Sequence, residues 1–450
     1  MCAAMKTAHV LVTLVALAPL ACLSSPPRNQ PVDTWDVEAA LAESALASPE
    51  RSAEILLALT FSGGGTRAAA FSYGVLQELA QTQVTVDGEP RRLVDEVDLI
   101  SSVSGGSFTA AYFGLHGEGI FERFEDRFLR RNMQAGLLLE VLRPRYWLGL
   151  LRIDRSQLAA RYYDRHVFEG ATFADLDRPG APQLLINATD LSTAGRFPFS
   201  PAWFGGICSD LSSYPISHAV TASSAVPIVF PTIRLRNYAG RCGFEVPDWM
   251  RGGEDQGRFG LRELALEELE QAYPDAEERP FIHLLDGGIS DNLGLANAVA
   301  SIAVIGDAER AFREMGHEEV RLILVITVNS EAGAERPWDR KDEAASSLEV
   351  VSGLSNAQIH NTNRMVMQLT KAGLGEWARQ LSRPDAPVRF EFVEVGFSQV
   401  ADSEEREALR RIETSFTLSD EKVDRLIAAA RQVLRESPEF QRALRALEQP

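Results

Sequence analysis

A serine stands where an apolar segment meets a glycine-rich one, within the stretch LISSVSGGSFTAAY at 99–112. Residues 94–103 have the composition and length of a strand, and the residues after Ser104 open an expected helix. A serine at such a turn presents its hydroxyl at the edge of a sheet, as a nucleophile elbow does. The turn requires small residues two places before and two places after the nucleophile, and Ser102 and Gly106 meet that requirement. The pattern predicts that Ser104 is a nucleophile.

This segment taken alone has a second interpretation. A Ser/Gly-rich loop before a helix also binds anions, because the N-terminus of a helix carries partial positive charge. Ser101, Ser102 and Ser107 are rival hydroxyls, but only Ser104 has a glycine two residues on and an apolar strand ending just before it. A serine nucleophile also needs a base and an oxyanion hole, so those residues must decide between the interpretations.

The base is expected at the end of another strand, and LLDGGISDN at 284–292 offers Asp286. The ordinary partner of a catalytic serine is histidine. The chain contains seven histidines: His9, His116, His166, His218, His283, His317 and His360. None of them lies in a turn after a late strand, and His283 is three residues before Asp286 in the same strand, facing elsewhere. We therefore expect a Ser–Asp dyad, the alternative being a turn-forming aspartate before two glycines.

Three consecutive glycines occur in TFSGGGTRAAAF at 60–71, between an expected strand and an expected helix. A dinucleotide fingerprint does not fit, because its third glycine would fall at Ala68 and no acidic residue ends a strand about 20 residues on. A P-loop does not fit either, because no Gly-Lys-Ser/Thr follows. Glycines let several backbone N–H groups converge on one point, where a helix dipole adds positive potential. The loop is therefore predicted to form an oxyanion hole.

Apolar runs of strand length alternate with helical patterns, which is typical of an α/β fold with a mostly parallel central sheet. The expected strands are 54–61, 94–103, 183–191, 281–288 and 320–330. Segments 120–180 and 235–280 are long between strands, and we expect helical insertions there that form a lid or cap.

The C-terminal part of the chain differs in pattern. Residues 387–397 alternate like a strand, and 418–437 form an amphipathic helix that is expected to pack on the protein rather than on a membrane. No linker separates this part from the rest. We therefore expect a hydrolase domain over 51–335 and a C-terminal helical extension over 336–450 that packs on the same domain.

Four blocks in this order, SGGGTRAAAFSYGVL, ISSVSGGS, TASSAVPIVFP and DGGISDN, resemble the patatin-like phospholipases over about 55 to 330. The resemblance implies a three-layer α/β/α fold with a Ser–Asp dyad, Ser104 as nucleophile and Asp286 as base. The implied oxyanion loop consists of Gly63, Gly64, Gly65, Thr66 and its basic residue Arg67, with the amide of Gly105 as a further donor. Two positions depart from the family pattern, since Ala68 and Ser102 replace glycines.

The expected function is that of a serine acyl hydrolase acting on phospholipid or another acyl-ester lipid at a membrane surface, with no metal and no cofactor. The alternative is a non-catalytic lipid-binding envelope protein of the same fold. A hydrolase of small esters or peptides would differ only in the shape of its pocket. The formal net charge is −18, from 45 Lys and Arg against 63 Asp and Glu, so nucleic acid is not an expected partner.

Residues 1–21 resemble a signal peptide, because Lys6 precedes an apolar run that is too short to span a bilayer. Cys22 follows the expected cleavage point and is a candidate lipid anchor, as in a bacterial lipoprotein, although Pro19 replaces the usual leucine. The expected location is the cell envelope, with a secreted or periplasmic protein as the alternative. Residues 22–50 are expected to be a linker.

Two cysteines are left once Cys2 and Cys22 are assigned to the N-terminal segment. Cys208 and Cys242 could form a disulfide in an exported protein, or remain two unpaired thiols, and the sequence leaves both open. No Cys/His spacing indicates zinc.

Overall fold

The computed structural model describes most of the chain, including every residue of the predicted site. The described residues are 26–36, 46, 48–142, 154–227, 230–245, 273, 275–303, 308–332, 342 and 347–448. Three expected features lie outside the described residues: the signal peptide, Cys22, and the boundary between the hydrolase domain and the extension at 335–336. Most of the insertion expected at 235–280 also lies outside them.

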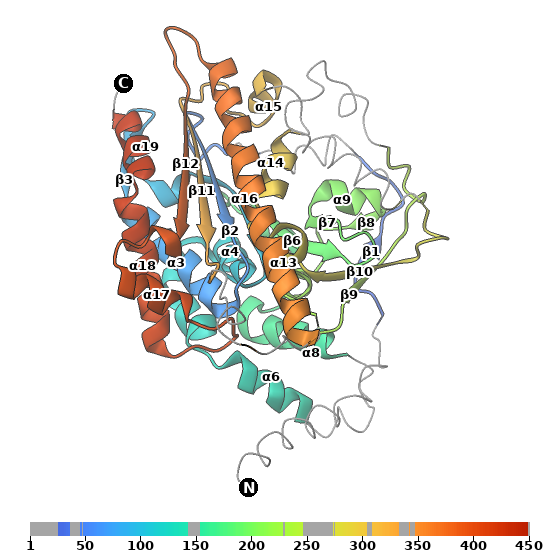
Figure 1. The fold of residues 1–450 in the computed structure, drawn as a ribbon. Helices are drawn as coiled ribbons and strands as arrows, with labels where there is room; N and C mark the ends of the chain where they lie inside the picture. Colours follow the sequence, from blue (N-terminus) through green and yellow to red (C-terminus); the bar gives the residue numbers. More distant parts are fainter. Residues whose placement is uncertain are drawn as a thin grey trace.

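A single mixed sheet forms the centre of the molecule (Figure 1). Its path runs β12 (Arg389–Gly396), β11 (Leu322–Asn329), β2 (Ile55–Phe61), β5 (Val97–Val103), β6 (Gln183–Asp190), β10 (Phe281–Asp286) and β9 (Ile233–Arg236). The five strands from β12 to β6 are parallel, whereas β10, β9 and the side strand β7 (Arg196–Phe199) pair antiparallel. The prediction of a mostly parallel sheet is confirmed, with an antiparallel edge beside β6.

The strands of the sheet centre are buried on both faces, which explains their continuous apolar runs. Along β2, Ile55, Leu57 and Leu59 belong to one hydrophobic cluster, whereas Leu56 and Ala58 belong to another. Alternate residues of a strand point to opposite faces, so the two clusters lie on opposite sides of the sheet. The fold is therefore a three-layer α/β/α arrangement, as predicted.

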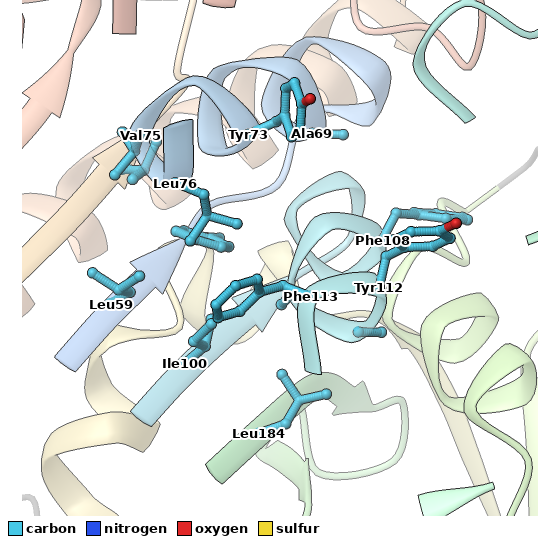
Figure 2. Packing of buried hydrophobic residues seen from close by; sticks show 14 of the residues in the cluster. Leu59, Ala69, Tyr73, Val75, Leu76, Ile100, Phe108, Tyr112, Phe113 and Leu184 are labelled. Carbon is cyan, nitrogen blue, oxygen red and sulfur yellow. The ribbon is translucent and has the colours of Figure 1, made fainter. Parts of the chain in front are cut away.

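Different helices cover the two faces. The first face carries α3 (Gly65–Gln81), α4 (Gly105–His116), α18 (Asp420–Glu436) and α19 (Pro438–Glu448). The second face carries α14 (Leu295–Ala303), α15 (Ala308–Glu314) and α16 (Ser347–Leu381). Figure 2 shows part of the first layer, where Leu76 of α3 and Phe113 of α4 pack over Leu59 and Ile100 of the strands. The two helices that follow the predicted glycine loop and nucleophile are thus fixed side by side on one face.

The C-terminal part of the chain completes the same sheet and layers. Strand β12 pairs in parallel with β11 along its whole length, and α18 lies against α3. A Cβ on Gly74 of α3 would come within 2.6 Å of the carbonyl oxygen of Ile427, so this glycine permits the close contact. Arg435 of α18 donates two hydrogen bonds to the buried carboxylate of Glu78, at 2.7 and 2.6 Å. The amphipathic helix predicted at 418–437 is therefore a packing helix.

Part of the segment expected to be a linker is attached to the domain. Strand β1 (Gln30–Pro31) pairs with β8 (Ser209–Asp210), and the buried Asn29 side chain donates to the carbonyl of Arg236 at 2.8 Å. The backbone polar groups of an extended segment need partners when buried, and this edge supplies them.

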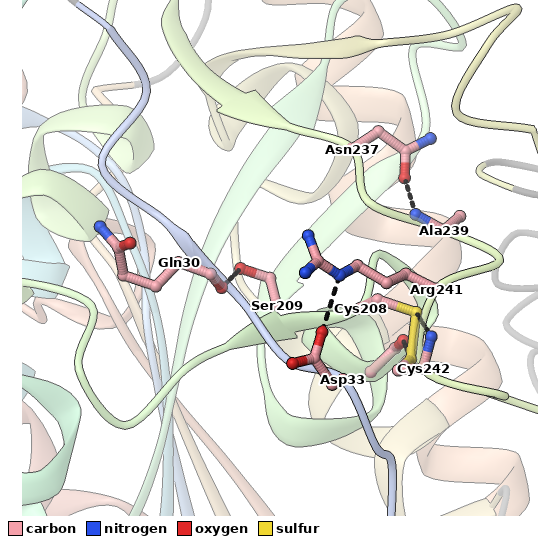
Figure 3. The surroundings of a disulfide bond; sticks show 9 residues. Gln30, Asp33, Cys208, Ser209, Asn237, Ala239, Arg241 and Cys242 are labelled. Carbon is pink, nitrogen blue, oxygen red and sulfur yellow. Dashed lines mark hydrogen bonds and ion pairs between the residues drawn. A yellow bond between two sulfur atoms is a disulfide. The ribbon is translucent and has the colours of Figure 1, made fainter.

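Next to this strand, Cys208 and Cys242 are joined by a disulfide with their Cα atoms 5.5 Å apart (Figure 3). The sequence had left this pairing open. The bond closes a segment of 34 residues. Closing a loop of that length stabilises the folded state by about 3 to 4 kcal/mol, because it removes entropy from the unfolded chain. Arg241 also pairs with Asp33 of the N-terminal segment at 2.7 Å.

The remaining helices lie around the sheet. Among the described residues, the remaining α-helices are α5 (Ile120–Phe124), α6 (Met133–Leu142), α8 (Arg155–Tyr163), α9 (Pro201–Gly206), α10 (Ile216–Ser223), α13 (Gly288–Asp291) and α17 (Ser403–Arg410). The first three belong to the insertion expected at 120–180, whose described residues are largely helical, as predicted. A two-stranded hairpin, β3 (Gln83–Val86) and β4 (Glu89–Arg92), follows α3. Among the residues described, no helix combines the length and apolarity needed to cross a membrane.

Candidate active site

Ser104 is the single residue between β5 and α4, with a φ of 50° and a ψ of −119°. A positive φ is uncommon for a residue with a side chain, and strain of this kind occurs at functional turns. A Cβ on Gly106 would lie 2.7 Å from the carbonyl oxygen of Phe61, so a larger residue does not fit there. Ser102 is accommodated in place of the usual glycine, because its hydroxyl donates to the carbonyl of Leu185 at 3.2 Å. The local geometry is that of a nucleophile elbow.

The structure brings Asp286 to Ser104 although 182 positions separate them in the chain. The Ser104 hydroxyl donates to Asp286 Oδ2 at 3.0 Å, while the N–H of Gly288 donates to Oδ1 at 2.8 Å. This second bond fixes the carboxylate so that one oxygen faces the serine. His283, the nearest histidine in sequence, is instead bonded to Thr232 at 3.0 Å. Within the described residues no histidine is bonded to Ser104 or Asp286, and the hydrogen-bonded pair in this site consists of the serine and the aspartate.

Burial raises the pKa of Asp286 to about 6, although the hydrogen bonds from Gly288 and Ser104 act in the opposite direction. We predict that kcat/KM for a neutral soluble ester rises with pH through about 6 and then levels off, because only the ionised carboxylate accepts the serine proton. Circular dichroism over the same range controls for unfolding. A midpoint near the ordinary aspartate value, or a flat profile, would contradict this assignment.

Two of the four amides expected in the oxyanion loop are already engaged. The N–H of Gly63 donates to the carbonyl of Asn292 at 3.1 Å, and the N–H of Thr66 donates to the carbonyl of Ser415 at 2.8 Å. The expectation that these two residues donate to an oxyanion is therefore corrected: they anchor the loop. Within the described part of the chain, the N–H groups of Gly64, Gly65 and Gly105 have no acceptor.

These open amides belong to two helix N-termini that meet. Gly64 and Gly65 begin α3 with φ values of 144° and 63°, which only glycine adopts readily, and Gly105 begins α4. A Cβ on Gly105 would lie 2.6 Å from the nitrogen and 2.0 Å from the oxygen of Gly65, so the two backbones are in close contact. Both helix dipoles add positive potential beside Ser104. This junction can stabilise negative charge on an oxygen bound next to the serine.

Replacing Gly105 with alanine should lower kcat by about 10²- to 10³-fold, the usual effect of losing an oxyanion donor, because the new Cβ overlaps the Gly65 carbonyl. The measurement is kcat with circular dichroism of the purified variant. Gly119→Ala is the control, since its Cβ would meet no atom closer than 3.6 Å. A Gly105→Ala enzyme with the wild-type kcat would show that this junction does not hold the oxyanion.

Arg67 lies in the first turn of α3 and is buried, with its Nη1 donating to the carbonyl of Ile412 at 2.7 Å. Burial lowers its pKa to about 10, while Glu331 and Glu413 raise it. The guanidinium flanks the loop, because its Nη2 would be 3.2 Å from a Cβ on Gly64. The resemblance placed Arg67 in the oxyanion loop; its side chain instead ties that loop to the C-terminal segment.

Sequence reasoning missed the residues that hold the loop from outside. Asn292 and Ser415 accept the two anchoring N–H groups, and Ser330 donates its hydroxyl to the carbonyl of Gly63 at 2.9 Å. Asn292 is the last residue of the DGGISDN block and Ser330 is the last residue of the strand predicted at 320–330. Both positions indicated that these residues could lie near the site. There was no such indication for Ser415, because nothing in the sequence pattern places it near the loop.

Comparison with known proteins adds independent findings. A family model described as patatin-like phospholipase matches residues 59–299, more than half of the 450 residues. Human GIVD cytosolic phospholipase A2 is 13% identical with a TM-score of 0.47, covering 94% of this chain and 68% of that chain. VipD from Legionella pneumophila is 15% identical with a TM-score of 0.32, and the match covers 96% of this chain and 72% of VipD. At these values the structural likeness carries no functional argument. A comparison with curated proteins found no match.

Proposed function

Because the chain belongs to the patatin-like phospholipase family, and so to the lipid acyl hydrolases, we propose that Ser104 attacks a lipid ester and Asp286 accepts its proton. The observation that carries the proposal is the 3.0 Å hydrogen bond from Ser104 Oγ to the buried carboxylate, beside three backbone amides that have no acceptor among the described residues. The raised pKa of Asp286 suits a base that works near neutral pH.

The first half of the reaction transfers the acyl group to the enzyme. As the Ser104 oxygen bonds to the ester carbonyl carbon, its proton passes to Asp286 Oδ2. The carbonyl oxygen becomes an oxyanion that accepts hydrogen bonds from the amides of Gly64, Gly65 and Gly105. The intermediate collapses, the ester C–O bond breaks, and the leaving alcohol takes the proton from Asp286.

The second half regenerates the enzyme. Asp286 takes a proton from water as the water oxygen attacks the acyl carbon of the Ser104 ester. The same amides hold the second oxyanion. When this intermediate collapses, the Ser104 oxygen leaves with the proton from Asp286, and the fatty acid is released. Each proton taken by the carboxylate is returned within the cycle, so one base serves both halves.

The proposed substrate is a phospholipid or another acyl-ester lipid, which the enzyme meets at a membrane surface. Export to the cell envelope is also part of the proposal, with residues 1–21 as signal peptide and Cys22 as candidate lipid anchor. The Cys208–Cys242 disulfide supports export, because disulfides persist in oxidising compartments. The intact dyad supports an enzyme over the alternative of a non-catalytic lipid-binding protein.

The test treats the purified wild-type protein with a fluorophosphonate probe, maps the modified peptide, and measures fatty-acid release from mixed phospholipid vesicles. Modification of Ser104 together with fatty-acid release is the expected result. Modification without release would retain the nucleophile and move the substrate to another acyl ester. Folded protein that is not modified and releases no fatty acid would overturn the proposal in favour of lipid binding.

A further inference from the structure

We propose that Ser223 is a positioning residue that fixes the nucleophile and the base relative to each other; this inference rests on the proposed function. Ser223 is the last residue of α10, within the TASSAVPIVFP block, and it is completely buried. Its side chain contacts the elbow and its main chain contacts the aspartate turn. No catalytic step passes through it, so its effect on the reaction is exerted through Ser104 and Asp286.

The side chain of Ser223 has a determined hydrogen-bond direction. Its hydroxyl donates to the carbonyl of Asn187 on β6 at 2.6 Å, so its remaining lone pairs are acceptors. They accept the backbone N–H of Ser104 at 2.8 Å and the hydroxyl of Ser107 at 3.1 Å. A single buried oxygen thus connects the elbow to the neighbouring strand.

The main chain beside this oxygen holds the base. The carbonyl of Ser223 accepts the N–H of Gly287 at 3.1 Å, and the carbonyl of Ala225 accepts the N–H of Asp286 at 3.1 Å. Ser223 is therefore bonded directly to both the elbow and the aspartate turn, and Ala225 to the aspartate turn. Neither the elbow nor the turn is adjacent to Ser223 in sequence, because 119 positions separate Ser223 from Ser104.

Two consequences for the reaction follow from these bonds. The N–H of Ser104 is occupied by the Ser223 oxygen, so Gly105 supplies the elbow amide that an oxyanion could use. The bond also holds Ser104 at its positive φ of 50°, from which its hydroxyl reaches Asp286. Without the Ser223 oxygen, a buried N–H loses its acceptor, and the turn can relax to a conformation in which the 3.0 Å contact is not kept.

The experiment compares Ser223→Ala with Ser224→Ala in the full protein. Both serines are buried and each variant loses one hydroxyl, but the Ser224 hydroxyl donates to carbonyls of α10, that of Val220 at 2.7 Å and that of Thr221 at 3.5 Å. We expect Ser223→Ala to lower kcat and the rate constant of fluorophosphonate inactivation by about 10- to 100-fold, with KM within about twofold. Ser224→Ala should keep wild-type values for all three, while the melting temperatures of both variants fall.

The outcomes separate this inference from the function it rests on. If wild type reacts and Ser223→Ala reacts as fast as Ser224→Ala, the inference is overturned and the proposed function stands. If wild type does not react, the proposed function falls and takes this inference with it. Should Ser223→Ala fail to fold, Ser223→Cys replaces it, because sulfur is a weak acceptor of similar size. A partial loss of kcat in Ser223→Cys supports the positioning role. The wild-type kcat in that variant overturns it.

Discussion

Replacing Ser104 with alanine should reduce kcat for lipid ester hydrolysis by at least about 10⁴-fold, to the level supported by the oxyanion donors alone. The covalent step is removed outright, because the hydroxyl that attacks the ester carbonyl and donates to Asp286 at 3.0 Å is gone. Fluorophosphonate labelling should disappear with it. The measurements are fatty-acid release from phospholipid vesicles and labelling, both on protein shown to be folded.

The matched control is Ser102→Ala, two residues earlier, in β5. Ser102 is also buried, but its hydroxyl donates to the carbonyl of Leu185 and does not contact Asp286. Its loss should leave kcat within a few-fold of wild type. If Ser102→Ala were inactive and Ser104→Ala active, the nucleophile would be misassigned. If neither variant changed the rate, the hydrolysis would arise from another site or from a contaminant.

Asp286→Asn should lower kcat/KM by about 10⁴-fold and at the same time stabilise the fold at alkaline pH. The amide oxygen still accepts the N–H of Gly288, so the geometry is kept, but an amide does not accept the serine proton. Loss of activity therefore reports loss of the base and not loss of structure. Hydrolysis rates and thermal unfolding of the same preparation measure the two effects.

The sign of the stability change follows from the pKa of Asp286, which burial raises from 3.8 to about 6 in the folded protein. The folded state binds the Asp286 proton more tightly than the unfolded chain does. Proton binding therefore stabilises the folded state fully below about pH 3.8, and this contribution is lost as the pH rises through about 6. Asparagine stays neutral and avoids the loss. The variant should exceed wild type in stability at pH 8 by up to about 3 kcal/mol, with the difference closing towards pH 4.

The control for this substitution is Asp291→Asn, five residues later at the end of α13. Asp291 is a buried carboxylate whose pKa is likewise raised by burial, but it accepts the N–H of Asn297 and has no bond to Ser104. We expect it to retain kcat within a few-fold. Equal losses of activity in both variants would mean that the structure of residues 286–291 as a whole, and not the Asp286 base, limits the reaction.

The sequence by itself was enough to predict candidate site residues at positions where the local backbone geometry restricts the residue type. Ser104 was predictable because a strand-to-helix turn at positive φ needs small neighbours, and Gly106 leaves no room for a side chain. The parallel sheet was predictable because its strands, such as β2, are buried on both faces and are therefore continuously apolar. These features depend on a residue and its near neighbours.

The tertiary structure alone decided which groups are available for the proposed reaction. Gly63 and Thr66 have the residue types of an oxyanion loop, yet the carbonyls of Asn292 and Ser415 occupy their N–H groups. Ser223 belongs to a recognisable block, but its bond to the Ser104 amide exists only because α10 ends beside the elbow. Hydrogen-bond partners are set by the positions of segments distant in sequence, and a local pattern contains no information about those positions.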